Sequence, residues 1–309
     1  MTAEGTHMGA FGSREWGLML FAGITWGASF LFIAEGLVAF EPGLIATLRI
    51  FFGALTLTFV KKARAPLPRE ALRPVVALGF LWMAFPFFLF AVAEQNITSA
   101  LAGMLNGAVP IFAVTIAAIM LRKAPSRLQL AGLAIGTTGL ILMGLPSLDS
   151  VSSAVGVLLV LVALASYGLS INIAAPLQQN YGALPVLWRS QIAALVMSLP
   201  LGGYALTQSS FAFVPLLAMI ALGVGGTALA FVAMTTLIGR VGGSRASVTI
   251  YITPPVALFL GWVLRDDSVA PIAIVGSAVA ILAAWVVSRE KAKPQIASSG
   301  DGRRPESQT

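Results

Sequence analysis

The chain has 309 residues, of which 58% are hydrophobic and only 10% are charged, and its mean hydropathy is +0.90. No water-soluble domain has this composition, so the sequence predicts an integral membrane protein. The formal net charge of +7 comes from loops and a C-terminal tail that would contact anionic lipid, and it is no argument for nucleic acid binding.

A helix that crosses a membrane needs about 20 apolar residues, and segments of this kind follow one another along almost the whole chain. We expect ten of them, at residues 15–35, 42–60, 73–93, 98–121, 127–146, 153–174, 184–206, 212–237, 245–264 and 270–288. Residues 1–14 are an N-terminal tail whose first residues, MTAEGTHM, resemble a cloning remnant, and residues 289–309 are a polar cytoplasmic tail that we expect to be disordered.

The pattern of the first half of the chain recurs in the second half. WGASFLF at Trp26 corresponds to YGLSINI at Tyr167, and Arg49 in ATLRIFFGAL corresponds to Arg189 in VLWRSQIAAL. A shift of about 140 residues predicts two five-helix repeats, at residues 15–146 and 153–288. Because five is an odd number of crossings, the second repeat must enter the membrane from the opposite side, so the repeat is inverted.

Basic residues fix the expected orientation, because Lys and Arg in short loops stay in the cytoplasm. If both termini are cytoplasmic, every Lys and Arg falls on the inner side except Arg265, which lies outside, and Arg49 and Arg189, which lie in the membrane. The opposite orientation would place nearly all the basic residues outside. We therefore expect an all-α membrane protein with both termini inside.

Missing residue types exclude most intramembrane enzymes. The chain has no Cys, and its one His is His7 in the N-terminal tail. A metal-dependent hydrolase needs His and carboxylate ligands at helical spacing, and a serine or cysteine protease needs a base beside its nucleophile. We therefore expect no enzyme activity, no metal and no cofactor.

No carboxylate is placed at mid-membrane, although ion-coupled carriers commonly keep one in the transport path. This favours facilitated movement down a gradient, or a coupling site made of neutral oxygens. Glu94 in FAVAEQNITSA is the nearest exception. It is either a transport residue or an interfacial loop residue, and the sequence favours the loop.

Polar and aromatic residues near mid-depth are the candidates for a transport path. Trp26 and Ser29 on the first helix and Tyr167 on the sixth stand at corresponding positions, although such side chains can also simply fill a bundle. Asn106 precedes Pro110 by one turn, and Tyr251 and Thr253 precede Pro254 and Pro255. A proline inside a helix frees a carbonyl four residues earlier, which could face a cavity.

Two further interpretations concern movement and charge. Pro86 corresponds to Gly226 in the second half, and with Pro110, Pro254 and Pro255 these residues are candidate hinges of a gate, the alternative being static kinks that improve packing. Arg49 and Arg189 are either anchors that reach nearby water and tie loops, or cavity cations that bind a substrate carboxylate. The sequence leaves both interpretations open.

Four stretches of the chain together resemble the EamA-type branch of the drug/metabolite transporter superfamily. They are WGASF, ATLRIFFGAL, the run from AEQNITSALAG to GTTGLILM, and the degenerate copy of that run from SRASVTIYITPP to AIVGSAVAIL. The resemblance covers residues 15–288. It departs from the family at LRKAPS, where Lys123 and Ala124 stand in place of the acidic residue that many members carry.

The resemblance implies a carrier of the bacterial inner membrane that exports amino acids or related metabolites through a central cavity between the repeats. Its partners would be a small-molecule substrate and the lipid bilayer, and a monomer is compatible with the sequence. Flat apolar walls favour aromatic or bulky neutral amino acids, and the residues that could form them are Trp26, Phe85, Tyr167 and Tyr251. Carriers of drugs, nucleosides or other metabolites would use the same residue types. A non-transporting receptor or assembly factor is the alternative from another class.

Overall fold

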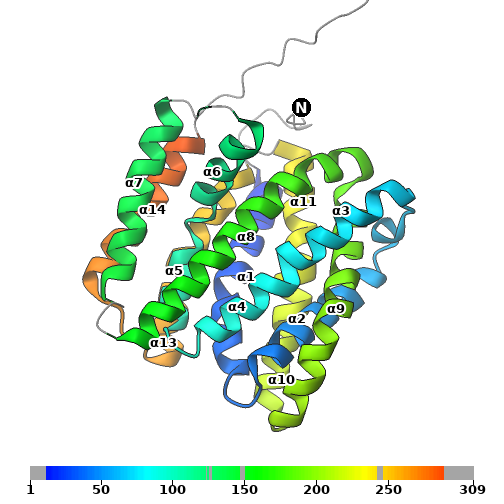
Figure 1. Cartoon of the computed structure of the whole chain (residues 1–309), viewed down its shortest axis with the longest axis horizontal. Coiled ribbons are helices and arrows are strands. Elements are labelled where there is room, and N and C mark those ends of the chain that lie inside the picture. Colours follow the sequence, from blue (N-terminus) through cyan, green and yellow to red (C-terminus); the bar gives the residue numbers. More distant parts are fainter. Residues whose placement is uncertain (1–11, 123, 125–126, 147–149, 242–245, 289–309) are drawn as a thin grey trace, which may run out of the picture.

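The computed structural model of the chain describes residues 12–122, 124, 127–146, 150–241 and 246–288, and these residues form one bundle of helices (Figure 1). The elements in chain order are α1 (Ser13–Gly36), α2 (Pro42–Thr58), η1 (Lys61–Arg64), α3 (Arg69–Gly79), η2 (Phe80–Ala84), α4 (Phe85–Ala93), α5 (Ser99–Asn106), α6 (Val109–Leu121), α7 (Arg127–Gly144), α8 (Val151–Tyr181), α9 (Ala183–Gln208), α10 (Phe213–Ile220), η4 (Ala221–Leu229), α11 (Ala230–Val241), η5 (Ser247–Ile252), α13 (Thr253–Arg265) and α14 (Pro271–Ser288).

Helix occupies each of the ten expected segments within the described residues. Six helical stretches are long and apolar enough to cross a membrane, and four shorter apolar helices lie at Pro42–Thr58, Leu130–Gly144, Thr249–Arg265 and Pro271–Ala283. The chain is therefore a multi-pass membrane protein, and the number of ten crossings stays a prediction. The tails expected at 1–14 and 289–309 lie outside the described residues, apart from residues 12–14.

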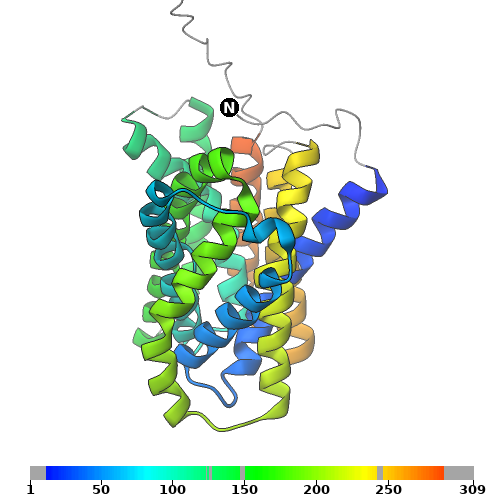
Figure 2. The same ribbon diagram turned by 90° about the vertical axis from the view of Figure 1, so that its right-hand side faces the viewer.

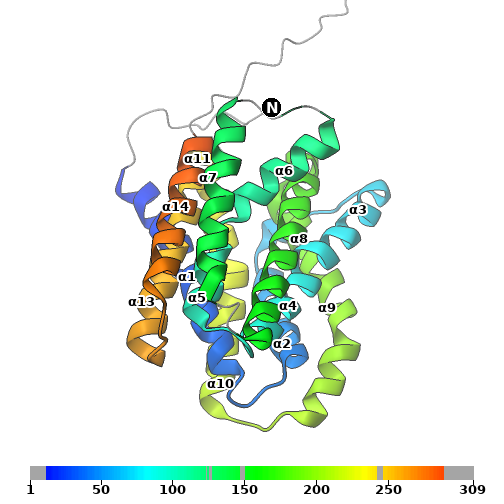
Figure 3. The ribbon, with the colours of Figure 1, turned by 60° about the vertical axis from the view of Figure 1, so that its left-hand side comes forward.

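Corresponding helices of the two halves pack against each other. Helix α2 packs on α9, α5 on α13, and α7 on α14, the last pair running side by side in Figure 3. Glycines permit the close approach, since a Cβ at Gly139 would lie 2.7 Å from the carbonyl oxygen of Gly276. The halves thus meet through equivalent elements, as expected of an internal repeat.

Helix α1 is tied to the second half at both of its ends. Near its start, Glu15 forms an ion pair with Arg240 of α11 at 2.5 Å, and near its end, Glu35 forms one with Arg265 of α13 at 2.7 Å. Figure 2 shows the start of α1 and the end of α14 at the same end of the bundle. Each end of the bundle therefore carries one ion pair between the two halves.

A second tie lies at the end that holds Arg265. The carboxylate of Asp267 accepts hydrogen bonds from the Ser99 hydroxyl at 2.7 Å and from the Ala100 backbone N–H at 3.0 Å. It thereby satisfies donors in the first turn of α5, which have no partner within their own helix. The loop after α13 thus caps a helix of the other half.

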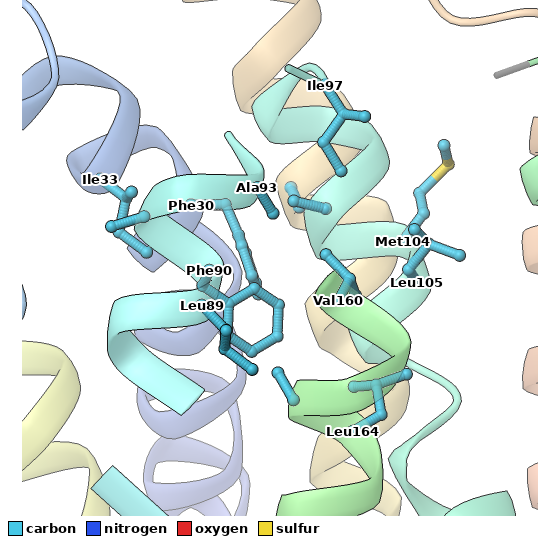
Figure 4. Close-up of a cluster of buried hydrophobic side chains, with 14 of the residues drawn as sticks. Phe30, Ile33, Leu89, Phe90, Ala93, Ile97, Met104, Leu105, Val160 and Leu164 are labelled. Atoms are coloured by element: carbon cyan, nitrogen blue, oxygen red, sulfur yellow. The ribbon is translucent and has the colours of Figure 1, made fainter. Parts of the chain in front are cut away.

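A hydrophobic cluster fills the space between α1, α4, α5 and α8 (Figure 4). Phe30 meets Phe90 edge to face, with ring centroids 5.5 Å apart, and Ile33, Leu105 and Leu164 are all less than 2% exposed. Between membrane-spanning helices such side chains stabilise the bundle through close van der Waals packing. The cluster closes this part of the bundle and leaves the space on the other side of Phe30 and Phe90 for a cavity.

The orientation of the bundle can be tested with single cysteines, because the chain has none of its own. Ser150 and Lys62 are both exposed and lie in turns that the topology assigns to opposite sides. With both termini inside, Ser150→Cys should react with an impermeant thiol reagent added to intact cells, and Lys62→Cys should react only after lysis. Rapid labelling of Lys62→Cys in intact cells would reverse the orientation.

Candidate functional site

A cavity of about 430 Å³ lies inside the bundle, where helices of both halves converge. Its volume is within the range of about 300–1,000 Å³ that is typical of small-molecule sites. Aromatic side chains dominate its wall, namely Trp26, Phe30, Trp82, Phe87, Phe90, Tyr167 and Phe231. The few polar groups among its lining residues are Ser29, Arg49, Asn106, Gln178, Thr235 and the Tyr167 hydroxyl.

The cavity lies nearer one end of the bundle. At that end its lining reaches Gln178 in the last turn of α8 and Ile238 near the end of α11. Toward the other end it stops at Phe30 and Phe90, which belong to the cluster of Figure 4. The end toward which the cavity extends is the one whose turns carry most of the basic residues.

The structure brings together six of the residues selected from the sequence. Trp26, Ser29, Arg49, Asn106, Pro110 and Tyr167 all line the cavity. The other eight selected residues are not among its lining residues, namely Phe85, Pro86, Arg189, Gly226, Tyr251, Thr253, Pro254 and Pro255. Phe85 instead stacks on Phe80, with centroids 5.4 Å apart and planes inclined by 19°, and Thr253 is fully buried with no hydrogen-bond partner for its hydroxyl oxygen in the described part of the chain.

Several wall residues were missed by the sequence analysis. Trp82 and Phe87 flank the selected Pro86, and Phe231 follows the selected Gly226 by five positions. Phe231 makes edge contacts with both Trp26 at 5.4 Å and Trp82 at 5.2 Å. The aromatic density of FLWMAFPFFLF was the available signal, but it does not tell which of its rings face inward.

Both candidate hinges on the third and eighth predicted spans lie at π-helices. The π-helix η2 ends immediately before Phe85 and Pro86, and the π-helix η4 contains Gly226. Their first residues, Phe80 and Ala221, have the same separation as Trp26 and Tyr167. A π-turn interrupts the regular α-helical hydrogen bonds and is frequent at functional sites.

Side chains from other helices satisfy the carbonyls of these π-helices. Trp26 of α1 donates its indole N–H to the Gly226 carbonyl at 3.1 Å, and Ser166 of α8 donates its hydroxyl to the Leu81 carbonyl at 2.5 Å. Helices α1 and α8 are the corresponding first helices of the two halves. Each half thus caps the irregular segment of the other.

The fourth predicted span is interrupted, and the ninth changes its helix type. Helix α5 ends at Asn106 and α6 begins at Val109, whereas the 3₁₀-helix η5 passes directly into α13 at Thr253. Pro110 stands at the second position of α6, where no N–H is needed, and Pro254 at the second position of α13. The expectation of a proline inside a continuous helix is therefore corrected at Pro110.

The turn between α5 and α6 contacts the start of α13. A Cβ at Gly107, between α5 and α6, would lie 2.5 Å from the Cγ atom of Pro254, so only a glycine fits there. Pro110 has no N–H to offer the carbonyl of Asn106, and Pro255 has none for that of Tyr251. We expected irregular backbone beside a cavity. The first half has this arrangement, since Asn106 and Pro110 line the cavity.

Arg49 and Arg189 have different surroundings although they correspond in the repeat. Arg189 is half-buried, and its Nη1 atom lies 3.5 Å from the carbonyl oxygens of Ala63 and Pro185, so it ties the turn after α2. Arg49 is buried and lines the cavity. The anchor interpretation therefore fits Arg189, and the cavity-cation interpretation fits Arg49.

The position of Arg49 follows from a close crossing of α2 and η4. Gly53 and Gly223 make this crossing possible, since a Cβ at Gly223 would lie 2.8 Å from the carbonyl oxygen of Arg49. The crossing brings the Thr227 hydroxyl to 2.9 Å from Nε of Arg49, which donates to it. The guanidinium carbon lies 3.7 Å from the ring centroid of Phe87, a cation–π contact that is worth about 2 kcal/mol when desolvated.

The hydroxyl that receives Arg49 is itself held in place. Thr227 donates to the carbonyl of Leu222 at 3.1 Å, and its own carbonyl accepts from Nε2 of Gln191 at 2.8 Å. Arg49 is thereby connected to the π-helix η4 and to α9. Neither Thr227 nor Gln191 was expected to have a role, although Gln191 lies in VLWRSQIAAL, two positions after Arg189.

Glu94 lies where an interfacial loop residue was expected, directly after α4, but its carboxylate is not exposed. Both of its oxygens are shielded from solvent and have no hydrogen-bond partner in the described part of the chain. Burial of a carboxylate without partners is costly. Its position directly after α4 agrees with a loop residue, and the choice between the loop and the transport interpretation stays a prediction.

Comparison with known proteins identifies this architecture. The profile of the EamA-like transporter family matches residues 15–145 and again residues 154–289. A solved structure titled "Crystal structure of protein" aligns with a TM-score of 0.60 at 16% identity, covering 89% of this chain and 96% of that one. It supports the fold alone.

Two full-length relatives carry names that describe transport. A "probable terminal-alkyne amino-acid exporter" of Streptantibioticus cattleyicolor is 26% identical over 94% of this chain and 98% of its own length. The "uncharacterized inner membrane transporter YedA" of Escherichia coli is 28% identical over 89% of this chain and 92% of its own length. Both similarities extend over both halves of the chain.

Proposed function

Because the chain belongs to the EamA-like transporter family, we propose that it exports amino acids with aromatic or bulky neutral side chains across the inner membrane. The observation that carries the proposal is the aromatic cavity at the junction of the two halves. The amino-acid exporter among the relatives supports the substrate class, and the inner-membrane relative supports the location.

The chemistry of the cavity matches such a substrate. Trp26, Trp82 and Phe231 form a continuous set of ring contacts against which an aromatic or branched side chain can pack. Aromatic pairs in edge or offset geometry are worth about 0.5–1.5 kcal/mol beyond the area that they bury. Asn106, Ser29 and Tyr167 offer neutral oxygens to an ammonium group.

The proposed mechanism is alternating access. The π-helices η2 and η4, the interruption before α6 and the change of helix type before α13 are points at which helix ends can swing. The ion pairs Glu15–Arg240 and Glu35–Arg265 tie α1 to the second half at opposite ends, so opening one end requires that its pair part. The alternative, that the prolines only improve packing, predicts no effect on movement when they are replaced.

The substrate class can be tested with the purified protein in liposomes. Wild type should accumulate labelled phenylalanine, tryptophan or leucine in exchange for unlabelled substrate. Phe231→Ala should raise KM for phenylalanine roughly tenfold, because it removes the ring between Trp26 and Trp82. Phe259→Ala is the matched control, since this ring on α13 is 58% exposed and faces away from the cavity. Transport of nucleosides or organic cations but of no amino acid would refute the proposed substrate.

The energy source is a separate prediction. None of the described residues that line the cavity is Asp or Glu, so we expect facilitated diffusion, with export driven by high internal substrate. Uptake down a phenylalanine gradient should proceed without a pH or sodium gradient and should be unchanged in Glu94→Gln. Uptake that requires a pH gradient and loses this requirement in Glu94→Gln would instead assign proton coupling to the buried carboxylate.

The gate is tested by restoring a backbone donor at the helix break. Pro110→Ala should leave expression and monodispersity in detergent near wild type while slowing transport severalfold, because α5 and α6 can then join into a straighter helix. Pro271→Ala, at the exposed start of α14, is the matched control and should change neither property. Unchanged transport in a double Pro110→Ala, Pro255→Ala variant would return these residues to a packing role.

A further inference from the structure

Arg49 places a positive charge in a cavity that has no acidic residue among its described lining residues. Its Nε donates to Thr227, and the ring of Phe87 covers one face of its guanidinium. The two Nη groups make no hydrogen bond and no ion pair within the described part of the chain. They are therefore the donors that this arrangement leaves for a bound molecule.

The surroundings of Arg49 orient these donors without neutralising them. Thr227 is a neutral acceptor and Phe87 is a ring, so neither cancels the charge. Among the described residues no acidic side chain forms an ion pair with Arg49, and both oxygens of the shielded Glu94 carboxylate are without a hydrogen-bond partner there. A buried cation without a counter-charge is costly, and a bound anion would remove that cost.

We infer that the Nη groups of Arg49 bind the carboxylate of the transported molecule, with its apolar body held between the aromatic walls. The planar guanidinium fork matches a carboxylate in a bidentate geometry. This inference rests on the proposed function and sharpens it: the molecules that the cavity accepts share a compact carboxylate on an aromatic or branched body. The carboxylate, and not the amine, is the charged group that the cavity selects.

The selection follows from the charges in the cavity. A substrate ammonium group meets only neutral acceptors there, such as the Asn106 and Ser29 side chains, whereas a carboxylate meets a full positive charge. Hydrogen bonds to a charged partner are roughly twice as strong as those between neutral groups. Loss of the carboxylate from a ligand should therefore weaken binding far more than loss of the amine.

Arg189 provides an internal comparison. It is the counterpart of Arg49 in the repeat, but it lies outside the cavity lining, against the carbonyls of Ala63 and Pro185. Because both residues are arginines on corresponding helices, replacing either one removes the same chemical group. Only the change at Arg49 should alter ligand selection.

Binding of three related compounds to the purified protein tests the inference. The probes are L-phenylalanine, 3-phenylpropionate, which lacks the amine, and 2-phenylethylamine, which lacks the carboxylate. Isothermal titration should show binding of the first two to wild type and at least tenfold weaker binding of the amine. In Arg49→Gln, affinity for both carboxylates should fall on the order of 10- to 100-fold, while Arg189→Gln should match wild type.

The comparison of the three compounds on wild type does not depend on whether Arg49→Gln folds. Arg49→Lys gives a second measurement: it keeps the charge but loses the guanidinium fork, so we expect an intermediate loss of affinity. Binding of phenylethylamine as tight as that of phenylalanine, or full carboxylate binding in a folded Arg49→Gln, would overturn the inference and leave amino-acid transport standing. Binding of phenylpropionate without phenylalanine would support the inference and refute an amino-acid substrate. Binding of none of the three to wild type would refute both.

Discussion

Within a bilayer, every backbone polar group must find its partner inside the protein, and this constraint governs the whole structure. The described residues nevertheless contain the π-helices η2 and η4. Each of these π-helices receives a donor from the other half of the molecule. Trp26 reaches the Gly226 carbonyl and Ser166 reaches the Leu81 carbonyl, each from the first helix of the opposite half. Other carbonyls of η4 are satisfied from within the second half, by Thr227 and Gln191.

The same constraint connects the cavity to the π-helix η4, which is one of the proposed points of movement. Trp26 lines the cavity with its ring and caps η4 with its N–H, and Thr227 of η4 orients Arg49. A molecule that packs on Trp26 and binds Arg49 therefore contacts two side chains that are fixed to the same π-helix. Differential contact of this kind is what a ligand needs in order to shift a conformational equilibrium. The cavity and the proposed hinge at η4 are thus in direct contact, through Trp26 and Arg49.

The sequence predicted the elements better than it predicted the site. Apolar length and the recurrence of Trp26 at Tyr167 and of Arg49 at Arg189 were sufficient to predict the helical segments and the internal repeat. Pro110 and Pro254 indicated where the helices are irregular, but not which form the irregularity takes. A proline at the second position of a new helix and a proline inside a kinked helix look the same in sequence. Glu94 lies in the expected turn, but position in a turn does not reveal that its carboxylate oxygens are shielded from solvent.

Duplication explains why repeated motifs revealed only part of the site. Corresponding positions share a fold but differ in their roles. Arg49 lines the cavity, whereas Arg189 ties a turn. Trp26 caps a carbonyl in one half, whereas in the other half Ser166, the neighbour of Tyr167, does so. The residues that hold Arg49, Phe87 and Thr227, correspond to each other in the repeat with unlike side chains. An inverted pair of helices can give both sides of the membrane similar access, whereas a substrate with one carboxylate needs only one cation. Among the described residues that line the cavity, Arg49 is the one cation, although its counterpart in the repeat is also an arginine.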